Sequence, residues 1–426
     1  MPSKKRGSTK LNVDAPEAKR TKRNSLAPVD TVKASGIARP RSPNVYRLPP
    51  LFPNLEDRQA GILLAIGQND VGQLGLGEDV ECAKKPKQVP NLTDIVSVAC
   101  GGMHTVCLHK SGEVSTFGCN DAGALGRETK EDSEELEPAK VSLPGKAIQV
   151  SAGDSHSAAL LEDGKVYAWG SFRVTAGKSE RKPVQLLAEK EVAKISSGDD
   201  HLVLLTVDGF VYTCGNPESG QLGRLSQRFA SRDTRQGIKS LLTPFLVDIH
   251  PHHRSSVKVR CNDIACGGYC TFAKDANTGN IYVFGLSNYK QIGLENEEPQ
   301  YHPTAKTTFQ DNSWKQISGK VYSLGRHHDG RLGLGESCDV TLNPTLVPAL
   351  QDKICTQVEC GSTVSFALTD NGKVYSWGFG QNLQLGTGDE DDAFEPVLVT
   401  GKQLEGRKVM AVASGGQHTM LIAKPE

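Results

Sequence analysis

The chain has 426 residues, enough for one large repeat architecture or for two or three ordinary domains. Its 44 glycines, against 4 methionines and 3 tryptophans, are typical of short strands joined by tight turns. The formal net charge of zero excludes a bulk electrostatic attraction to nucleic acid or to membranes. Neither a signal-peptide core nor an apolar run of membrane-spanning length is present, so we expect a soluble intracellular protein without a membrane partner.

The charge is unevenly distributed, because the first 47 residues are strongly basic and show no apolar periodicity. Such a segment cannot bury a core, so we expect a disordered tail over residues 1–47 and an extended lead-in over 48–61. Two basic clusters are typical of a bipartite nuclear import signal, read by an import receptor, and of DNA phosphate contacts; a merely solubilising tail is the alternative. The clusters consist of Lys4, Lys5, Arg6, Lys19, Arg20, Lys22 and Arg23.

A nine-residue motif bounded by glycines recurs along the rest of the chain. A seventh copy begins as WGSFR at Trp169 and then departs from the pattern. The six regular copies are GQNDVGQLG from Gly67, GCNDAGALG from Gly118, GNPESGQLG from Gly215, GLSNYKQIG from Gly285, GRHHDGRLG from Gly325 and GFGQNLQLG from Gly378.

A second element accompanies the first, as in VACGGMHTVCL from Val98 and VASGGQHTMLI from Val412. Hairpin turns then lead into alternating strands such as VYAWG, and they include Asp163-Gly164, Asp208-Gly209 and Asn371-Gly372. Turns of this type supply a positive φ, and the alternation gives each strand one buried face. Each repeat is therefore expected to hold several short antiparallel strands.

One repeat is too small to bury its own apolar face, so neighbouring copies must share their cores. Seven copies in a ring predict an all-β, seven-bladed β-propeller over residues 62–424. ILLAIG at Ile62 is a late strand without an early one, and the final HTMLIA is an early strand without a late one. Pairing these strands from the two termini completes one blade and removes two open sheet edges.

The chemistry-bearing motifs of enzymes are missing from this sequence. The eleven cysteines form no C-x-x-C pair, so we expect buried reduced thiols, as at Cys100, Cys107, Cys214 and Cys360, and no zinc or redox site. We find no P-loop, H-E-x-x-H or G-x-S-x-G motif, and the glycine-rich strings recur in turns between strands. We therefore expect no cofactor, no metal and no covalent catalysis.

Histidines and acidic residues recur at the loop positions of the repeat. Each histidine can hold a turn by donating to a backbone carbonyl, the interpretation that we favour for His156 and His201. The acidic residues either cap turns or form a negative rim that steers a basic partner. The two sets are His104, His156, His201 and His418, and Asp70, Asp121, Asp154 and Asp200.

The strings GGMHTVCL, FGCNDAGALGR, SAGDSH, WGSFR, GLSNY and GGQHT resemble those of the regulator of chromosome condensation family, from Ile62 onward. Propeller-bearing ubiquitin ligases share the glycines but not these strings. The resemblance implies a guanine nucleotide exchange factor for the nuclear GTPase Ran, without covalent chemistry and bound to chromatin. It implies Ran-binding or exchange roles for Asp70, His104, Asp154, Arg173, Gly177, Asp200, Arg224, Asn288 and His418.

The chain departs from this family at two places. The wedge that presses on Ran falls at Arg173–Gly177, in a repeat where 45 residues separate Gly170 from Gly215, against 52 in the preceding repeat. At Ser318–Gly319, WKQIS runs directly into GKVYSLG without the expected G-G-x-H-T strand. We therefore expect incomplete blades around Ser171–Pro183 and Ser318–Gly319, and an exchange-impaired protein is one alternative function.

A long basic loop, RLSQRFASRDTRQGIKS, begins at Arg224. The family uses this loop to place arginines on the acidic patch of the histone octamer, where guanidinium groups pair bidentately with carboxylates. The resemblance implies this nucleosome-binding role for Arg228, Arg232 and Arg235, and a solvated loop is the alternative. A silent scaffold that binds chromatin or another protein, and a substrate-recognition propeller of a ligase, are the other functional classes.

Overall fold

The computed structural model describes residues 46–174, 179–230, 237–251, 255–306 and 319–425, all of which belong to one compact unit, Val45–Glu426. The basic tail up to residue 45, with the seven import and DNA residues predicted in it, lies outside the described residues. No helix in the described part of the chain is both long enough and apolar enough to cross a membrane.

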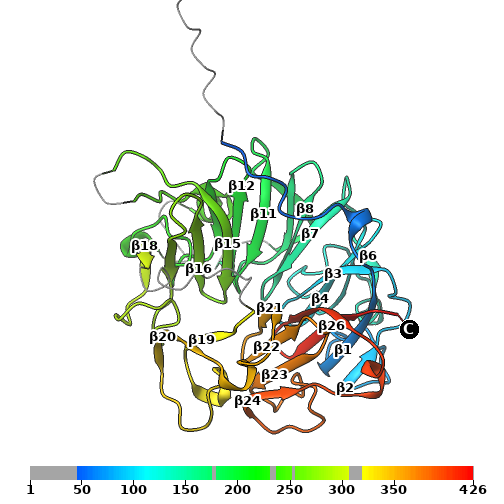
Figure 1. The fold of residues 1–426 in the computed structure, drawn as a ribbon. Coiled ribbons are helices and arrows are strands. Elements are labelled where there is room, and N and C mark those ends of the chain that lie inside the picture. Colours follow the sequence, from blue (N-terminus) through cyan, green and yellow to red (C-terminus); the bar gives the residue numbers. More distant parts are fainter. Residues whose placement is uncertain (1–45, 175–178, 231–236, 252–254, 307–318, 426) are drawn as a thin grey trace, which may run out of the picture. The chain divides into compact units, whose positions relative to one another are not determined.

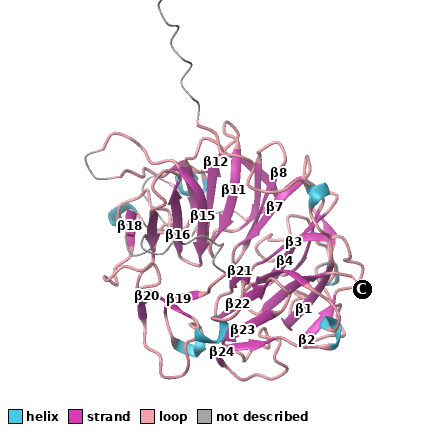
Figure 2. Cartoon of the chain, in the orientation of Figure 1, coloured by secondary structure: helices cyan, strands magenta, loops and turns pink. Residues whose placement is uncertain are grey.

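The described residues form seven antiparallel sheets that follow one another around a centre (Figure 1) and are joined by loops (Figure 2). Five sheets of four strands run in chain order. They are β3 (Ile95–Cys100), β4 (His104–His109), β5 (Val114–Gly118) and β6 (Ala139–Lys140); β7 (Ala147–Ala152), β8 (His156–Leu161), β9 (Val166–Gly170) and β10 (Glu180–Leu186); β11 (Val192–Ser197), β12 (His201–Thr206), β13 (Val211–Gly215) and β14 (Phe245–Leu246); β15 (Cys261–Gly267), β16 (Cys270–Asp275), β17 (Ile281–Gly285) and β18 (Gln300–Lys306); and β21 (Cys355–Cys360), β22 (Val364–Thr369), β23 (Val374–Gly378) and β24 (Ala393–Leu398).

Helical segments are short and lie in the connections. They are η1 (Leu55–Asp57), η2 (Asp132–Glu134), η3 (Gln227–Phe229), α1 (Ile238–Leu242), η5 (His328–Gly330), η6 (Pro348–Leu350) and η7 (Lys402–Leu404). The predicted hairpin turns are confirmed, because Gly164, Gly209 and Gly372 have φ of 77°, 80° and 80°.

The sixth sheet of four strands is built from both ends of the chain. It is ordered β2 (Cys82–Gln88), β1 (Ile62–Gln68), β26 (His418–Ala423) and β25 (Val409–Ser414). β1 pairs antiparallel with β26, with Ile62 opposite Ala423 and Gly67 opposite His418. The predicted closure of the propeller by strands from both termini is confirmed.

The seventh sheet has two strands among the described residues, β19 (Tyr322–Gly325) and β20 (Thr341–Leu346). It follows the Ser318–Gly319 junction, where the sequence lacks the strand that the other repeats have. Val321 and Val347 share a core cluster with Phe366 and Trp377 of the next blade, so this sheet is packed as a blade. By contrast, the sheet of β7–β10 has all four strands, and the shortening at 171–183 falls in the loop before β10.

Inner strands of successive blades are joined at one end of the sheets. The backbone N–H of Asp154 donates to the carbonyl of Asp199 (2.8 Å), and the N–H of Asp199 donates to the carbonyl of Gly268 (2.8 Å). Within the inner strands, the side chain of Gln149 on β7 exchanges two hydrogen bonds with the backbone of Ile195 on β11, at 2.8 and 2.9 Å. These bonds tie the blades together where their apolar faces meet.

Five of the outer strands, β2, β10, β18, β20 and β24, carry a proline at the point where the pairing register shifts. Proline has no N–H to donate, and on an outer strand it discourages pairing with another chain. These prolines therefore lie where the ladder of backbone hydrogen bonds between the two outermost strands is already interrupted. They are Pro86, Pro183, Pro303, Pro344 and Pro396.

Residues 46–61 pass over the hairpin ends of several blades. The N–H of Leu48 donates to the carbonyl of Val207 (2.7 Å), and Arg58 donates to the carbonyl of Ile148 (2.7 Å). Leu48 and Leu55 are buried in two different core clusters. The lead-in is therefore a packed part of the propeller unit.

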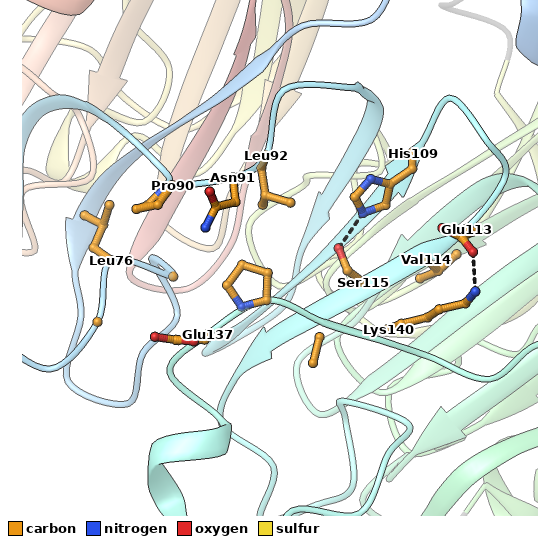
Figure 3. Close-up of a pocket in the computed structure, with 14 residues that line it drawn as sticks. Leu76, Pro90, Asn91, Leu92, His109, Glu113, Val114, Ser115, Glu137 and Lys140 are labelled. Carbon is orange, nitrogen blue, oxygen red and sulfur yellow. Dashed lines mark hydrogen bonds and ion pairs between the residues drawn. The ribbon is translucent and has the colours of Figure 1, made fainter.

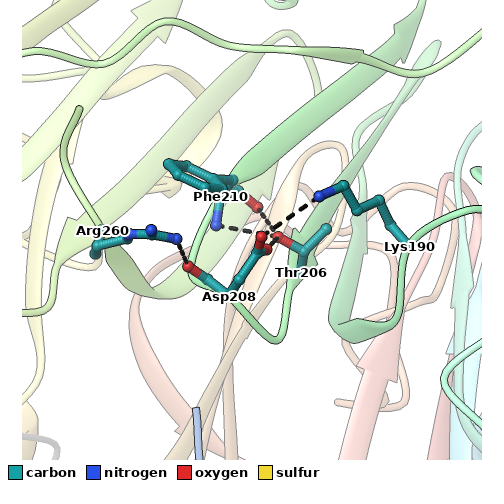
Figure 4. A network of polar contacts seen from close by, with 5 residues as sticks. All are labelled: Lys190, Thr206, Asp208, Phe210 and Arg260. Carbon is teal, nitrogen blue, oxygen red and sulfur yellow. Dashed lines mark hydrogen bonds and ion pairs between the residues drawn. The ribbon is translucent and has the colours of Figure 1, made fainter. Parts of the chain in front are cut away.

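Figure 4 shows the polar network beside the start of this lead-in. The guanidinium of Arg260 lies 3.8 Å from the ring centre of Phe210 and 5.6 Å from that of Tyr46. Arg260 also donates to the backbone carbonyl of Asp208, whose carboxylate lies 3.5 Å from Nζ of Lys190. The stacked cation anchors the first described residue to a hairpin turn.

Five of the eleven cysteines are buried and all eleven are free thiols. Cys107 and Cys214 are buried as expected, whereas Cys100 is half-buried and Cys360 is exposed. Cys100 donates to the carbonyl of Ala413 in the preceding blade (3.4 Å). The blade before Cys360 is the two-stranded one, so the described residues place no inner strand beside that thiol.

The repeat glycine that lies three residues before each histidine is fixed by packing between blades. A Cβ on Gly198 would lie 2.2 Å from Cε1 of His201 and 2.6 Å from the carbonyl oxygen of Gly267 in the next blade. Gly153 is similarly enclosed by His156. No room exists for a methyl group at these positions.

Gly198→Ala is therefore expected to lower the free energy of unfolding by about 1–3 kcal/mol, because the added methyl group would separate two blades. Urea denaturation measures the effect. Gly145→Ala is the matched control, since the nearest heavy atom to its Cβ would be Cδ1 of Leu161 at 3.5 Å. Equal stability of the two variants would contradict the packing argument.

Candidate functional site

Those predicted site residues that the structure describes gather at one edge of the propeller, which we call the loop edge. It comprises the turns between first and second strands and the nine-residue loops between third and fourth strands. The two kinds of turn meet there: Gly67, which begins a loop, pairs with His418, and Gln68 N–H donates to the carbonyl of Gln417 (3.1 Å). Each loop therefore stands beside a repeat histidine.

Three repeat histidines bind a hydroxyl of the next blade. Nε2 of His104 lies 2.8 Å from Oγ of Ser157, which in turn donates to the carbonyl of Ala124 in a nine-residue loop (2.8 Å). Because the hydroxyl donates to that carbonyl, the histidine donates to the hydroxyl. The same relay runs from His418 through Thr105 (2.9 Å). The expected bond to a backbone carbonyl is thus made through a hydroxyl.

His201 makes this contact with Thr271 at 2.9 Å, whereas His156 does not. The equivalent residue of the blade after His156 is Leu202, which has no hydroxyl, and the imidazole instead packs against Phe172 with ring centres 4.3 Å apart. All four histidines are at most 1% exposed. A role of His104 and His418 in binding a protein partner would therefore act through the loops that they hold.

Burial lowers the pKa of all four histidines, because the charged imidazolium would lose its hydration. The pKa of His104 falls to about 4, and those of His156, His201 and His418 fall to about 3. The unfolded chain, with histidine pKa near 6.5, binds more protons below that pH. Stability is therefore complete above about pH 6.5 and is lost as the pH falls towards these values.

Unfolding free energy is expected to drop by about 2 kcal/mol per buried histidine between pH 6.5 and 5. Urea denaturation at several pH values gives the proton uptake from the slope. His201→Gln should remove close to one proton from it, whereas His302→Gln, at an exposed position of β18, should leave the slope unchanged. A slope that is the same in both variants would refute this account.

The loop edge brings together three of the predicted residues, Asp154, Arg173 and Asp200. Arg173 forms an ion pair with Asp154, and its Nε lies 4.0 Å from Oδ1 of Asp200, which is 3% exposed. The hydroxyl of Ser155 donates to Asp154 (2.8 Å), and Nε of Arg173 donates to that hydroxyl (3.2 Å). Arg173 adopts a φ of 49°, a left-handed conformation that costs energy for a residue with a side chain.

A third carboxylate, Asp199, belongs to this cluster and was missed by sequence reasoning. Its pKa is raised by burial and by the neighbouring charge of Asp154. The signal was present in the sequence, because GDSH and GDDH place Asp154 and Asp199 at the same repeat position, with Asp200 one residue later. One guanidinium, that of Arg173, is thus shared by a group of three carboxylates that we call the aspartate cluster.

The other predicted residues lie apart from the aspartate cluster. Asp70 and Asn288 are exposed at the tips of nine-residue loops. Arg224 is half-buried, donates to the carbonyls of Thr213 (3.2 Å) and Ser240 (3.1 Å), and holds the base of the long basic loop. Burial lowers its pKa.

Several predicted residues fall where the structure does not describe the chain. Gly177 of the wedge position, and Arg232 and Arg235 of the basic loop, lie outside the described residues. Arg228 is described and exposed, with its guanidinium 6.0 Å from the ring centre of Phe229. The basic loop therefore presents at least one solvent-facing arginine.

A cavity of about 400 Å³ lies between β5, the short β6 and the loop segments 75–77 and 90–92 (Figure 3). Its polar side chains pair with one another: His109 lies 2.8 Å from both Asp94 and Ser115, and Glu113 pairs with Lys140. Within the described part of the chain, no group of three or more His, Cys, Asp or Glu residues is arranged to hold a metal ion. We therefore place the candidate site at the loop edge.

The family model described as the RCC1-like domain matches residues 62–421. The human regulator of chromosome condensation is 46% identical over 415 residues, which cover 91% of this chain and 98% of the human protein. The guanine nucleotide exchange factor SRM1 of Saccharomyces cerevisiae is 29% identical and covers 83% of this chain and 85% of its own length.

Two solved structures have the same fold. Prp20p from Saccharomyces cerevisiae, described with its binding to Gsp1p and histones, superposes with a TM-score of 0.74 at 26% identity, covering 89% of this chain and 93% of its own. Yeast RCC1 (Prp20) bound to Kap60 gives a TM-score of 0.76 at 25% identity, with coverages of 94% and 97%.

Proposed function

The chain belongs to the regulator of chromosome condensation family, and from this premise we propose how it acts. It is a guanine nucleotide exchange factor for the small GTPase Ran, it acts in the nucleus on chromatin, and it makes or breaks no covalent bond. The observation that carries the assignment is 46% identity over nearly the whole human relative, together with the aspartate cluster at the loop edge.

Nucleotide exchange requires only that the factor binds the nucleotide-free GTPase more tightly than the nucleotide-bound one. A GTPase holds its nucleotide through P-loop amides and Mg²⁺, so a factor that binds the nucleotide-free state more tightly accelerates release. An acceleration of ~10⁵-fold corresponds to about 7 kcal/mol of such preference. The aspartate cluster supplies carboxylates that would attract basic groups of Ran and fix their register. The relays of histidines and hydroxyls hold the nine-residue loops that carry Gln73, Ala124 and Gln221.

Release of labelled GDP from Ran, with and without the protein, tests the assignment. Asp154→Asn is expected to lower kcat/KM for release about tenfold, because it removes the more exposed carboxylate of the cluster. Asp163→Asn is the matched control, since Asp163 is an exposed, ion-paired aspartate at the opposite, hairpin edge. If the two variants release GDP equally fast, the cluster is not part of the Ran site.

A weakened exchange activity is the second candidate. It is favoured by the two-stranded sheet of β19 and β20 and by the shortened loop after β9. The maximal release rate, compared with that of the human relative under the same conditions, separates a full from an impaired exchange factor. An equal rate would exclude impairment.

Chromatin binding is assigned to the basic loop and to the tail. We assign contact with the acidic patch of the histone octamer to Arg228, Arg232 and Arg235, because guanidinium groups pair bidentately with carboxylates. The tail clusters would bind DNA phosphates and an import receptor. Support comes from the yeast relatives, whose structures are described with histones and with Kap60.

Charge reversal at both Arg232 and Arg235 is expected to abolish nucleosome binding and to leave Ran binding intact, because the loop and the aspartate cluster use different side chains. Gel-shift and Ran pull-down assays on the same protein give both readouts. Lys402→Glu with Lys408→Glu is a control of equal charge change on another blade. Loss of both activities together would contradict the separation of the two surfaces.

A further inference from the structure

The nine-residue loops of the loop edge are equivalent positions of one repeat. Counting the first glycine as position 1, the residue at position 6 has a φ between 58° and 81° in all six regular loops. The residue at position 4 is exposed in each of them. These residues are Asp70, Asp121, Glu218, Asn288, His328 and Gln381.

The order of the blades places two of these residues, His328 and Gln381, between two that match family positions. Asn288 belongs to the blade of β15–β18, His328 to that of β19–β20, Gln381 to that of β21–β24, and Asp70 to the closing blade. Arg326 stacks over Tyr289 of the preceding loop at 4.7 Å. A protein that contacts both Asn288 and Asp70 along this arc would pass over the loop of His328.

The loop after β19 is joined to the following blade as well. The N–H of Gly335 donates to the carbonyl of Phe394 (3.1 Å), and a Cβ on Gly330 would lie 2.4 Å from the carbonyl oxygen of Ala393. The loop is therefore held on both sides, although its own sheet has two described strands.

In this loop the hydrogen bond that closes the turn is shifted by one residue along the chain compared with the other loops. In the first loop Gly72 N–H donates to the carbonyl of Asn69 (3.1 Å), whereas here Arg331 N–H donates to that of His328 (3.3 Å). Asp329 takes a φ of 58° to allow this shift. His328 remains the exposed member of a histidine pair, with its ring centre 4.5 Å from that of half-buried His327.

The charges around His328 differ from those at Asp70. The carboxylate of Asp329 is occupied by Arg331 at 2.7 Å, and Arg326 adds a second guanidinium on the same loop. Residues 326–331 therefore present hydrogen-bond donors and contain two arginines against one aspartate. Their natural complement is a carboxylate or a carbonyl oxygen.

We infer that His328 is a specificity-determining contact for the GTPase, donating a hydrogen bond to an acceptor on the surface that lies between the groups over Asn288 and Asp70. This inference rests on the proposed exchange function and extends it to a residue outside the aspartate cluster. We take this contact to be made equally in the ground state and in the exchange complex, so that its loss would change KM and not kcat.

Three variants test this inference by a split between KM and kcat for GDP release from Ran. His328→Glu is expected to raise KM about tenfold, and His328→Ala about three- to fivefold, with kcat unchanged. His328→Gln, which keeps a donor, should restore most of the affinity. His302→Glu is the control, because His302 is an exposed histidine on the outer strand β18.

A KM for His328→Glu equal to that of His302→Glu would overturn the inference, as would a loss confined to kcat. Urea denaturation of each variant identifies a folding defect. If His328→Glu or His328→Ala is unstable, the KM of His328→Gln decides the test. If the unmodified protein accelerates no release from Ran, the proposed function fails, and this inference fails with it. If the protein is active and all His328 variants match the control, only this inference fails.

Discussion

The pairing of β1 with β26 is the constraint on which the rest of the structure depends. Without it, the first blade would lack its two inner strands and the last two strands of the chain would form an isolated hairpin. Leu64 and Leu421, opposite each other in this pairing, are completely buried. Because each blade buries its face only against its neighbours, closure is what removes the last open edges.

The interlocking of glycine, histidine and hydroxyl connects this architecture to function. The glycine before each histidine lets two blades approach, and the histidine then bonds through Ser157, Thr105 or Thr271 to a loop carbonyl. The loops that carry exposed carboxylates are thereby fixed by buried neutral groups. A rigid rim can discriminate between two states of a partner, since it cannot adapt equally to both.

Within the described part of the chain, the sheet of β19 and β20 has fewer strands than any other. Val358 on β21 is 57% exposed, whereas its repeat equivalents Val150, Ile195, Ile264 and Val412 are at most 6% exposed and Val98 is partly buried. The described residues provide no inner strand beside it. Exposed apolar surface of this kind costs stability, about 1.5–3 kcal/mol for a side chain of this size left uncovered.

Sequence alone determined the fold class, the number of repeats and the closure, because turn glycines and alternating strands recur once in each repeat. It also predicts an incomplete blade at Ser318–Gly319, where a motif is missing from the sequence. It could not find Asp199 as a neighbour of Asp154, nor the ion pairing of Arg173 with both Asp154 and Asp200, since Asp199 and Asp200 lie on the blade that follows that of Asp154 and Arg173. Only the ring geometry decides which side chains meet across blades, because contacts between repeats depend on their rotation about the centre and not on their separation along the chain.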